Sequence, residues 1–189
     1  MGTGREQNDF ILRCTRCGDG VVPFKFKYGV LICSNCTSQL DHNEVTVERS
    51  DNIVGPFLGQ YFIYSNFFPV VVVFDYFGYW SIEHAYQAAK TLDPAERMKI
   101  SDAKKPGKAK SLGRLVELRP DWEEVKFSIM EELVRYKFVK YPPFGKMLLE
   151  TGDKHIEEIN TWGDRVWGTV NGVGENNLGK ILMKIRGEL

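Results

Sequence analysis

The stretch SIEHAYQAAK, at residues 81–90, decides the fold class of this chain. Ser81 is a good helix N-cap, and neither glycine nor proline interrupts the residues that follow it. Apolar side chains recur from Ile82 at positions i, i+3, i+4 and i+7, which places them on one helical face. We therefore expect a helix over residues 82–90, with a mainly α domain built around it.

The pattern on either side of this stretch predicts more helices and a few short strands. The expected helices cover residues 94–103, 108–116, 121–140, 144–151 and 176–186. Aromatic and β-branched residues predict strands at 61–64 and 70–74, and residues 156–159 read as a short strand or turn.

All four cysteines lie near the N-terminus, where Cys14, Cys17, Cys33 and Cys36 form the pattern C-x2-C-x15-C-x2-C. Two such knuckles can place four thiolates around one tetrahedral zinc ion at about 2.3 Å. Apolar residues between the knuckles predict a short hairpin, so the pattern indicates a small β zinc ribbon. Because four cysteine ligands leave no open position, we expect the zinc to be structural. Two disulfides are the alternative, which an intracellular location argues against.

A polar segment follows the cysteines, and we place a domain boundary near residue 50. Residues 1–50 would form the ribbon and a linker, and residues 51–189 the main domain. The ribbon carries local positive charge that nearby acids partly offset. Contact with nucleic acid and a purely structural role are therefore both open for it.

Charge and hydropathy narrow the function classes. The chain of 189 residues has 25 Lys+Arg and 25 Asp+Glu, so its zero net charge disfavours a general polyanion binder. Its longest apolar stretch, Phe67–Phe74, contains Pro69 and is too short to span a bilayer. The N-terminus lacks an apolar run of signal-peptide length. We expect a cytoplasmic protein with no membrane partner and no organic cofactor.

Glu83 and Gln87 lie one turn apart at the start of the helix expected over residues 82–90. The helix dipole favours an anionic side chain at that end. The carboxylate either only complements the dipole, or it holds ribose hydroxyls and stabilises a developing cation.

Two later segments leave comparable alternatives open. The loop WGDRVWG, residues 162–168, either presents Asp164 and Trp167 or is a turn with core tryptophans. The glycine-rich segment 172–179 leads into a helix, whose first amides can receive phosphate. Residues 97–114 carry seven basic side chains and one acidic side chain. This segment is either a solvated helical face or a site that attracts a diphosphate or a nucleic-acid backbone.

Taken in order, eight short motifs of the chain resemble the NADAR, or YbiA-like, family over roughly residues 57–188. The motifs are S-N-F-F-P, E-H-x-Y-Q, K-x-L-G-R, D-W, K-F, L-L-x-T-G, W-G-D-x-x-W-G and G-x-N-x-L-G-K-I-L-M-x-I-R. The cysteines lie outside the resemblance, so the ribbon reads as an added module. Two places depart from the family pattern, Ala85 and the ending Trp167-Gly168-Thr169-Val170, and they bear on the choice of substrate.

The resemblance implies a mainly helical YbiA-like fold and an N-glycosidase, a hydrolase of ribosyl N-glycosidic bonds. The substrate that the resemblance implies is either ADP-ribosylated guanine in nucleic acid, which we favour, or a phosphorylated intermediate of riboflavin biosynthesis. A non-catalytic module that binds ADP-ribose or nucleic acid is a further alternative. Glu83, Trp122, Asp164 and Trp167 match the family's functional positions.

The remaining motif residues are expected to bind the substrate. They are Asn66, Gln87, Lys110, Arg114 and Asn176. Cleavage of a ribosyl C–N bond builds positive charge on the sugar, which a fixed carboxylate stabilises while a second one activates water. Glu83 and Asp164 are the expected pair, with a tryptophan stacking on the leaving base and Lys110 and Arg114 holding phosphate.

Overall fold

The computed structural model describes residues 10–17, 24–27, 30–33, 39–40, 45–49 and 52–189. The chain divides into two compact units. The first contains Met1–Ser65 and Thr151–Met183, and the second contains Asn66–Glu150 and Lys184–Leu189. The boundary near residue 50 between ribbon and main domain stays a prediction.

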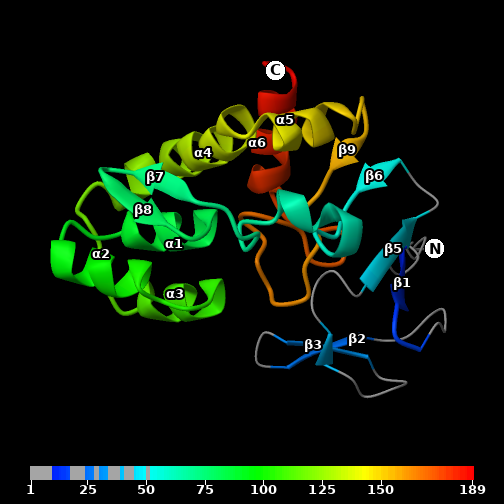
Figure 1. The fold of residues 1–189 in the computed structure, drawn as a ribbon, viewed down its shortest axis with the longest axis horizontal. Helices are drawn as coiled ribbons and strands as arrows, with labels where there is room; N and C mark the ends of the chain where they lie inside the picture. The colour runs from blue at the N-terminus through cyan, green and yellow to red at the C-terminus, as the bar shows by residue number, and fades with distance from the viewer. Residues whose placement is uncertain (1–9, 18–23, 28–29, 34–38, 41–44, 50–51) are drawn as a thin grey trace, which may run out of the picture. The chain divides into compact units, whose positions relative to one another are not determined.

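The second unit is built around α1 (Ile82–Ala88), and all seven residues of this helix are buried. It contacts α2 (Pro94–Ser101), α3 (Pro106–Leu112) and α4 (Trp122–Lys140), and also the hairpin of β7 (Val72–Phe74) and β8 (Phe77–Tyr79) (Figure 1). A further helix, α5 (Pro142–Leu149), packs on α4. The helix expected from residues 81–90 is therefore the centre of this unit.

Prolines begin three of these helices, which explains where the expected bounds were wrong. Asp93 caps α2 through a bond of 2.8 Å from the Ala95 amide, with Pro94 next to it as expected. The prolines at Pro106 and Pro142 were expected to interrupt helices, yet each occupies the first turn of one. A proline is tolerated there because the N–H groups of the first turn have no acceptor within the helix, so the lack of an N–H breaks no hydrogen bond.

The strand expected over residues 70–74 is confirmed in part by β7, whereas the strand expected over 61–64 is wrong. Those residues end a 3-10 helix, η2 (Gly59–Tyr64), that buries Ile63 and Tyr64. The Gln60 side chain pairs with the backbone of Val47, receiving a bond of 3.1 Å from its N–H and donating one of 2.7 Å to its carbonyl. Tertiary contacts thus override the strand propensity of an aromatic, β-branched run.

The described part of the first unit contains seven short strands. Pairing is antiparallel between β1 (Phe10–Cys14) and β5 (Val45–Arg49), and along β2 (Phe24–Lys27), β3 (Val30–Cys33) and β4 (Gln39–Leu40); it is parallel between β6 (Ile53–Val54) and β9 (His155–Ile156). The pair β2–β3 confirms the hairpin expected between the cysteine knuckles. The last helix, α6 (Asn177–Arg186), starts in this unit.

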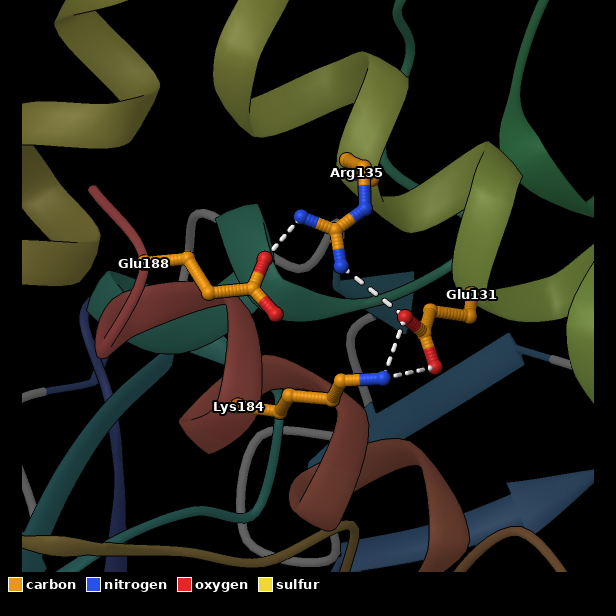
Figure 2. Close-up of polar contacts among 4 residues, drawn as sticks. All are labelled: Glu131, Arg135, Lys184 and Glu188. Atoms are coloured by element: carbon orange, nitrogen blue, oxygen red, sulfur yellow. Dashed lines mark hydrogen bonds and ion pairs between the residues drawn. The ribbon is translucent and has the colours of Figure 1, made fainter.

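The end of α6 and the residues after it belong to the second unit, where four charged side chains tie them to α4. We call this set the C-terminal clamp: Glu131, Arg135, Lys184 and Glu188. Figure 2 shows the Arg135 guanidinium between the carboxylates of Glu188 and Glu131. Its bond to Glu131 is 2.9 Å long. Lys184 donates to both Glu131 oxygens, at 2.7 and 2.9 Å.

The expected class, a helical domain with a few short strands, is confirmed for the part of the chain that the structure describes. The longest helix is α4, with 19 residues. None of the helices among the described residues has both the length and the apolar character that crossing a membrane requires.

Candidate active site

Glu83 is a buried carboxylate in the first turn of α1, with only 5% of the residue exposed. Its backbone N–H donates to the Asn66 carbonyl at 3.0 Å, so the S-N-F-F-P motif fixes the start of the helix. Its Oε1 accepts a bond of 2.9 Å from Gln87 Nε2. The i, i+4 spacing seen in the sequence therefore places a neutral donor on a buried acid.

His84 has a structural part in the same helix. Its ring nitrogens lie 2.7 Å from Ser81 Oγ and 3.0 Å from the Ala103 carbonyl. A carbonyl can only accept, so Nε2 carries the proton and Nδ1 accepts from the serine hydroxyl. Burial lowers the pKa of His84, which favours this neutral form. The histidine joins α1 to the segment between α2 and α3.

A glycine brings α3 close to α1. A Cβ atom built on Gly113 would lie 2.2 Å from Gln87 Oε1 and 2.7 Å from Gln87 Cβ. Only glycine fits this approach without a shift of the glutamine. The glycine of K-x-L-G-R thereby sets the distance between α3 and the Glu83–Gln87 pair.

Lys90, at the end of the segment that follows α1, is influenced by charges from α1 and from the region of α3. Burial lowers the pKa of Lys90, the Glu83 charge opposes that effect, and the charges of Lys110 and Arg114 lower the pKa further. Lys90 Nζ lies 6.0 Å from the ring centroid of Tyr86. We call the residues Glu83, Gln87, Lys90, Lys110 and Arg114 the α1–α3 cluster.

Trp122 supports this cluster from the start of α4. Its ring packs against Tyr86 with a centroid distance of 5.1 Å, and Lys90 Nζ lies 5.9 Å from its centroid. The residue is 6% exposed, so its main observed contact is packing. Stacking of Trp122 on a leaving base stays a prediction.

In the first unit, Asp164 organises the loop that follows β9. Its Oδ1 accepts bonds from the amides of Val166, at 3.1 Å, and Trp167, at 2.9 Å. The Asn160 side chain holds the backbone of the same residue, because its Oδ1 accepts from the Asp164 N–H and its Nδ2 donates to the Asp164 carbonyl. The carboxylate therefore shapes the turn that carries Trp167.

Asn176 and the first amides of α6 close this loop. Asn176 donates to the Ile156 carbonyl at 2.9 Å and accepts from the Glu158 amide at 3.1 Å. The amides of Asn177 and Leu178 donate to loop carbonyls at 3.2 and 3.0 Å. These amides are occupied by the chain itself, which argues against phosphate at this helix start. We call residues 160–178 the Asp164 loop.

The sequence profile of the NADAR domain matches residues 33–189, which is most of the chain. The chain belongs to the NADAR family.

Several relatives of this NADAR chain carry names that describe an activity. An N-glycosidase of Nostoc punctiforme is 42% identical over 118 residues, which cover 59% of this chain and 75% of that protein. A riboflavin biosynthesis protein of Vibrio vulnificus is 35% identical over 128 residues, covering 66% of this chain and 35% of that protein. The chain thus spans about a third of the Vibrio protein's length.

A solved structure supports the same fold. The NMR structure of the Escherichia coli protein YbiA superposes with a TM-score of 0.64 at 32% identity, covering 72% of this chain and 82% of that one. YbiA of the same organism is named an N-glycosidase. The expected YbiA-like fold is confirmed, and so is the enzyme class, a hydrolase of N-glycosyl bonds.

The structure groups the predicted site residues of the NADAR chain by unit. The second unit holds Asn66, Glu83, Gln87, Lys110, Arg114 and Trp122, and the first holds Asp164, Trp167 and Asn176. The pairing of Glu83 with Asp164 on one sugar joins residues of different units and stays a prediction.

Sequence reasoning missed two lysines of the NADAR chain. Lys90 is the last residue of the stretch 81–90. Its position directly after the apolar helical face is a signal by which the sequence could have identified it. Lys137 is fully buried in α4, with Nζ 4.8 Å from the Phe68 ring centroid, and burial lowers its pKa well below the usual value. A lysine in the middle of a long helix gives no signal of this kind in the sequence.

The two cysteine knuckles begin in the same way. Cys14, which is buried, is the last residue of β1, and Cys33 is the last residue of β3. Cys36 lies outside the described residues. Among the residues that are described, no group of three or more His, Cys, Asp or Glu side chains could hold a metal ion. The strand-then-knuckle arrangement fits a zinc ribbon, and the zinc site stays a prediction.

Proposed function

We propose that this chain hydrolyses the N-glycosidic bond between ADP-ribose and guanine in nucleic acid. The buried Glu83 carboxylate, oriented by Gln87, is the observation that carries the proposal. The relatives named N-glycosidases support the reaction type. The choice of substrate rests on the family resemblance and on the cations of the α1–α3 cluster.

The reaction breaks the bond from the ribose C1′ to the base nitrogen and forms a bond from C1′ to a water oxygen. The electron pair stays on the base nitrogen, which takes up one proton while the water loses one. Positive charge develops on the ribose, and a fixed carboxylate in a water-poor site stabilises it. Glu83 is the proposed stabilising group and Asp164 the proposed base for the water.

The other predicted residues take binding roles in this proposal. Asn66 Oδ1 and Gln87 Oε1 are buried and accept no hydrogen bond from the described residues, so each is suited to a hydroxyl donor. Trp167 or Trp122 would stack on the base, and Asn176 would line the pocket through the loop that it holds.

A second substrate is favoured by one finding, the relative named a riboflavin biosynthesis protein. In that case the same bond is cleaved in a small phosphorylated ribosyl metabolite. The proposed partners are thus an ADP-ribosylated nucleic acid or such a metabolite.

The deciding experiment measures release of free ADP-ribose from an oligonucleotide that carries ADP-ribosylated guanine, using the full chain. A parallel reaction offers a phosphorylated intermediate of riboflavin biosynthesis. We expect release in the first reaction and its loss in Glu83→Gln, while Glu150→Gln, which alters an exposed carboxylate on the same unit, keeps it. Binding of the oligonucleotide without any turnover would contradict the proposal, and turnover of the metabolite alone would favour the second substrate.

We also propose one structural zinc ion held by Cys14, Cys17, Cys33 and Cys36. A segment of this size has too small a core to fold alone, so metal binding would supply folding free energy. Elemental analysis of the purified chain is expected to give one zinc per chain. Cys36→Ser should lower this ratio, and a wild-type ratio near zero would contradict the site.

A further inference from the structure

The hairpin of β7 and β8 turns an apolar face outward. Val72 and Tyr79 pair across the hairpin, and both are buried. Because successive side chains of an extended chain point to opposite sides, the residues next to this pair lie on the other side of the hairpin. Three of them are exposed, and we call them the hairpin face: Val71, Val73 and Trp80. Trp80 is the largest of the three and is 65% exposed.

The turn of this hairpin carries a tyrosine in an unfavourable backbone conformation. Asp75 and Tyr76 form a two-residue turn between the paired Phe74 and Phe77, and their φ angles are +48° and +67°. Glycine and asparagine suit such positions, whereas a bulky aromatic residue is strained there. Tyr76 is 99% exposed, so packing against the described chain does not account for its ring. Strain at such an exposed position points to a function of the side chain.

Helix α2 lies along this hairpin. Arg97 pairs with Asp75 at the turn, and Ser101 Oγ donates to the Gly78 carbonyl at 3.0 Å. Since Arg97 and Ser101 are four residues apart, one side of the helix makes both contacts. The helix therefore runs beside β8 in the direction of Trp80.

One histidine ring joins the end of the hairpin face to the segment after α2. His84 Nε2 lies 3.0 Å from the Ala103 carbonyl, and His84 Nδ1 lies 2.7 Å from Ser81 Oγ. Ser81 directly follows Trp80 in the chain, and two exposed lysines directly follow Ala103. These lysines are Lys104 and Lys105. Trp80 and the two lysines therefore lie at the same end of the hairpin.

The segment after α2 carries cations that the described chain leaves unpaired. Arg97 is neutralised by the acid of the hairpin turn. In contrast, Lys104, Lys105 and Lys108 are exposed and form no ion pair with another described residue. The same segment holds one exposed acid, Asp102, so a positive excess remains beside the hairpin face.

The chemistry of this surface selects its partner. Exposed rings stack on nucleobases and neighbouring lysines pair with phosphates, and single-stranded nucleic acid offers both groups together. In a duplex the faces of the bases are stacked on one another, so a single strand fits better. Protein interfaces are depleted in lysine, so a second copy of the chain fits this surface less well.

We propose that the hairpin face, with Tyr76 at its turn and Lys104 and Lys105 at its end, docks a single strand of nucleic acid by base stacking and phosphate contacts. This inference goes beyond the reaction at Glu83 and rests on the proposed function for nucleic acid as the partner. Binding of an unmodified strand requires neither ADP-ribose nor turnover. Failure of the docking surface is therefore distinguishable from failure of the hydrolase.

The test is fluorescence anisotropy of the full chain with a labelled, unmodified single-stranded oligonucleotide and with the corresponding duplex. We expect the wild type to bind the single strand more tightly. Trp80→Leu keeps an apolar side chain but removes the ring, so it should weaken binding of the single strand by about 5- to 100-fold. Trp80→Phe keeps a ring and should retain most of the affinity.

Tyr76→Gly separates binding from folding. Glycine adopts the conformation of this turn without strain, so the variant should unfold at the same temperature as the wild type or at a higher one. It should nevertheless bind the single strand more weakly, because a stacking ring is lost. A merely structural tyrosine would show no loss of affinity at preserved stability.

The lysines are tested through the salt dependence of binding. The double variant Lys104→Gln with Lys105→Gln should bind the single strand more weakly. It should also reduce the slope of log affinity against log salt concentration by about 1.4, since each phosphate contact on a single strand contributes about 0.7. Lys146→Gln, which alters an exposed lysine of α5, should change neither quantity.

Four results would overturn the docking surface. They are equal affinity of the wild type for single strand and duplex, no binding of either, unchanged affinity in Trp80→Leu, and an unchanged salt slope in the double lysine variant. Self-association that Trp80→Leu abolishes, measured by analytical ultracentrifugation, would assign the hairpin face to a second copy instead.

Turnover separates this inference from the proposed function. On an oligonucleotide that carries ADP-ribosylated guanine, Trp80→Leu should raise KM and leave kcat unchanged, because the ring acts in docking only. Release of ADP-ribose with an unaltered KM would leave the hydrolase standing without the docking surface. Binding of the strand that depends on Trp80, without any release, would do the reverse.

Discussion

The α1–α3 cluster and the Asp164 loop differ in how far their polar side chains are hydrogen-bonded within the described chain. In the cluster, Gln87 has an acceptor that receives no bond from the described residues, and the charges of Glu83, Lys110 and Arg114 all act on Lys90. In the loop, Asp164 Oδ1 accepts two amides and the Asn176 side chain both donates and accepts. In the proposed function, the first region uses its open acceptor and its charges to bind a ligand, whereas the second uses its polar groups to fix a turn.

This difference predicts how substitutions divide between activity and stability. A side chain whose capacity is kept for a ligand can be changed at little cost to folding. A side chain bonded to backbone amides cannot, because its loss leaves those amides without a partner. Substitutions in the cluster should reduce function alone, and those in the loop should reduce function and stability together.

The largest effect is expected from Glu83→Gln. Glutamine keeps an oxygen for the Gln87 donor but removes the charge, so kcat should fall by about 10²- to 10³-fold. The melting temperature should change little. Steady-state release of ADP-ribose and thermal unfolding of the same preparations measure both quantities. A large drop in melting temperature would contradict this division of roles, because Glu83 would then be needed for folding.

A pair of substitutions at Asp164 comes next. Asp164→Ala leaves the amides of Val166 and Trp167 without their acceptor, which should cost about 1–3 kcal/mol of unfolding free energy and much of the turnover. Asp164→Asn keeps an oxygen for both amides and removes the charge. We expect it to recover the stability but not the turnover, as measured by urea unfolding and product release.

The asparagine variant separates two roles of the loop. If it recovers turnover as well as stability, Asp164 only shapes the turn, and the predicted pair of carboxylates reduces to Glu83. If it recovers neither, the charge itself is needed for the loop to fold.

Part of this comparison could be predicted from the sequence. The periodicity of residues 81–90 placed α1 correctly, and the i, i+4 spacing of Glu83 and Gln87 placed them in contact. Local patterns of this kind depend only on helix geometry. The strand expected at 61–64 was wrong because contacts between Gln60 and Val47, distant in sequence, decide that segment.

Long-range contacts also explain what the sequence left out. Nothing local shows that Gly113 lies against Gln87, or that Lys90 lies over two rings from different helices. The glycine-rich start of α6 matched a phosphate-binding pattern, yet the structure gives those amides to loop carbonyls. A glycine motif indicates a close approach, and only the fold tells whether ligand or chain occupies it.

Two glycines at the ends of α3, Gly107 in its first turn and Gly113 at its C-cap, allow a matched test. Gly113→Ala places a methyl group against Gln87, which should cost about 1–3 kcal/mol and weaken phosphate binding by displacing the cluster. Gly107→Ala meets nothing within 4 Å and should stabilise the helix by about 0.5 kcal/mol without changing affinity. Urea unfolding and titration with pyrophosphate measure both. If Gly113→Ala and Gly107→Ala have the same stability and the same affinity for pyrophosphate, Gly113 has no part in positioning the α1–α3 cluster.

The smallest effect is expected at the C-terminal clamp, where opposite charges already pair at the surface (Figure 2). Hydrogen bonds from Lys184 and Arg135 lower the pKa of Glu131 in the folded chain. Its stabilising contribution is therefore complete above the unfolded pKa of about 4.3, and it is lost as the pH falls through the lower folded value. Glu131→Gln should reduce the unfolding free energy at neutral pH by about 1 kcal/mol or less.

Added salt should reduce this loss of stability further, because it screens the ion pairs. Turnover should not change, because the charges of the clamp pair with one another. Unfolding of wild type and Glu131→Gln at pH 7 and near pH 3, with and without salt, measures the difference. The two proteins should converge at the acid end. A loss of turnover at unchanged stability would give the clamp a functional role, as proposed for the α1–α3 cluster, instead of a structural one like that of the Asp164 loop. Ion pairing between side chains would then not distinguish structural residues from functional residues in this chain.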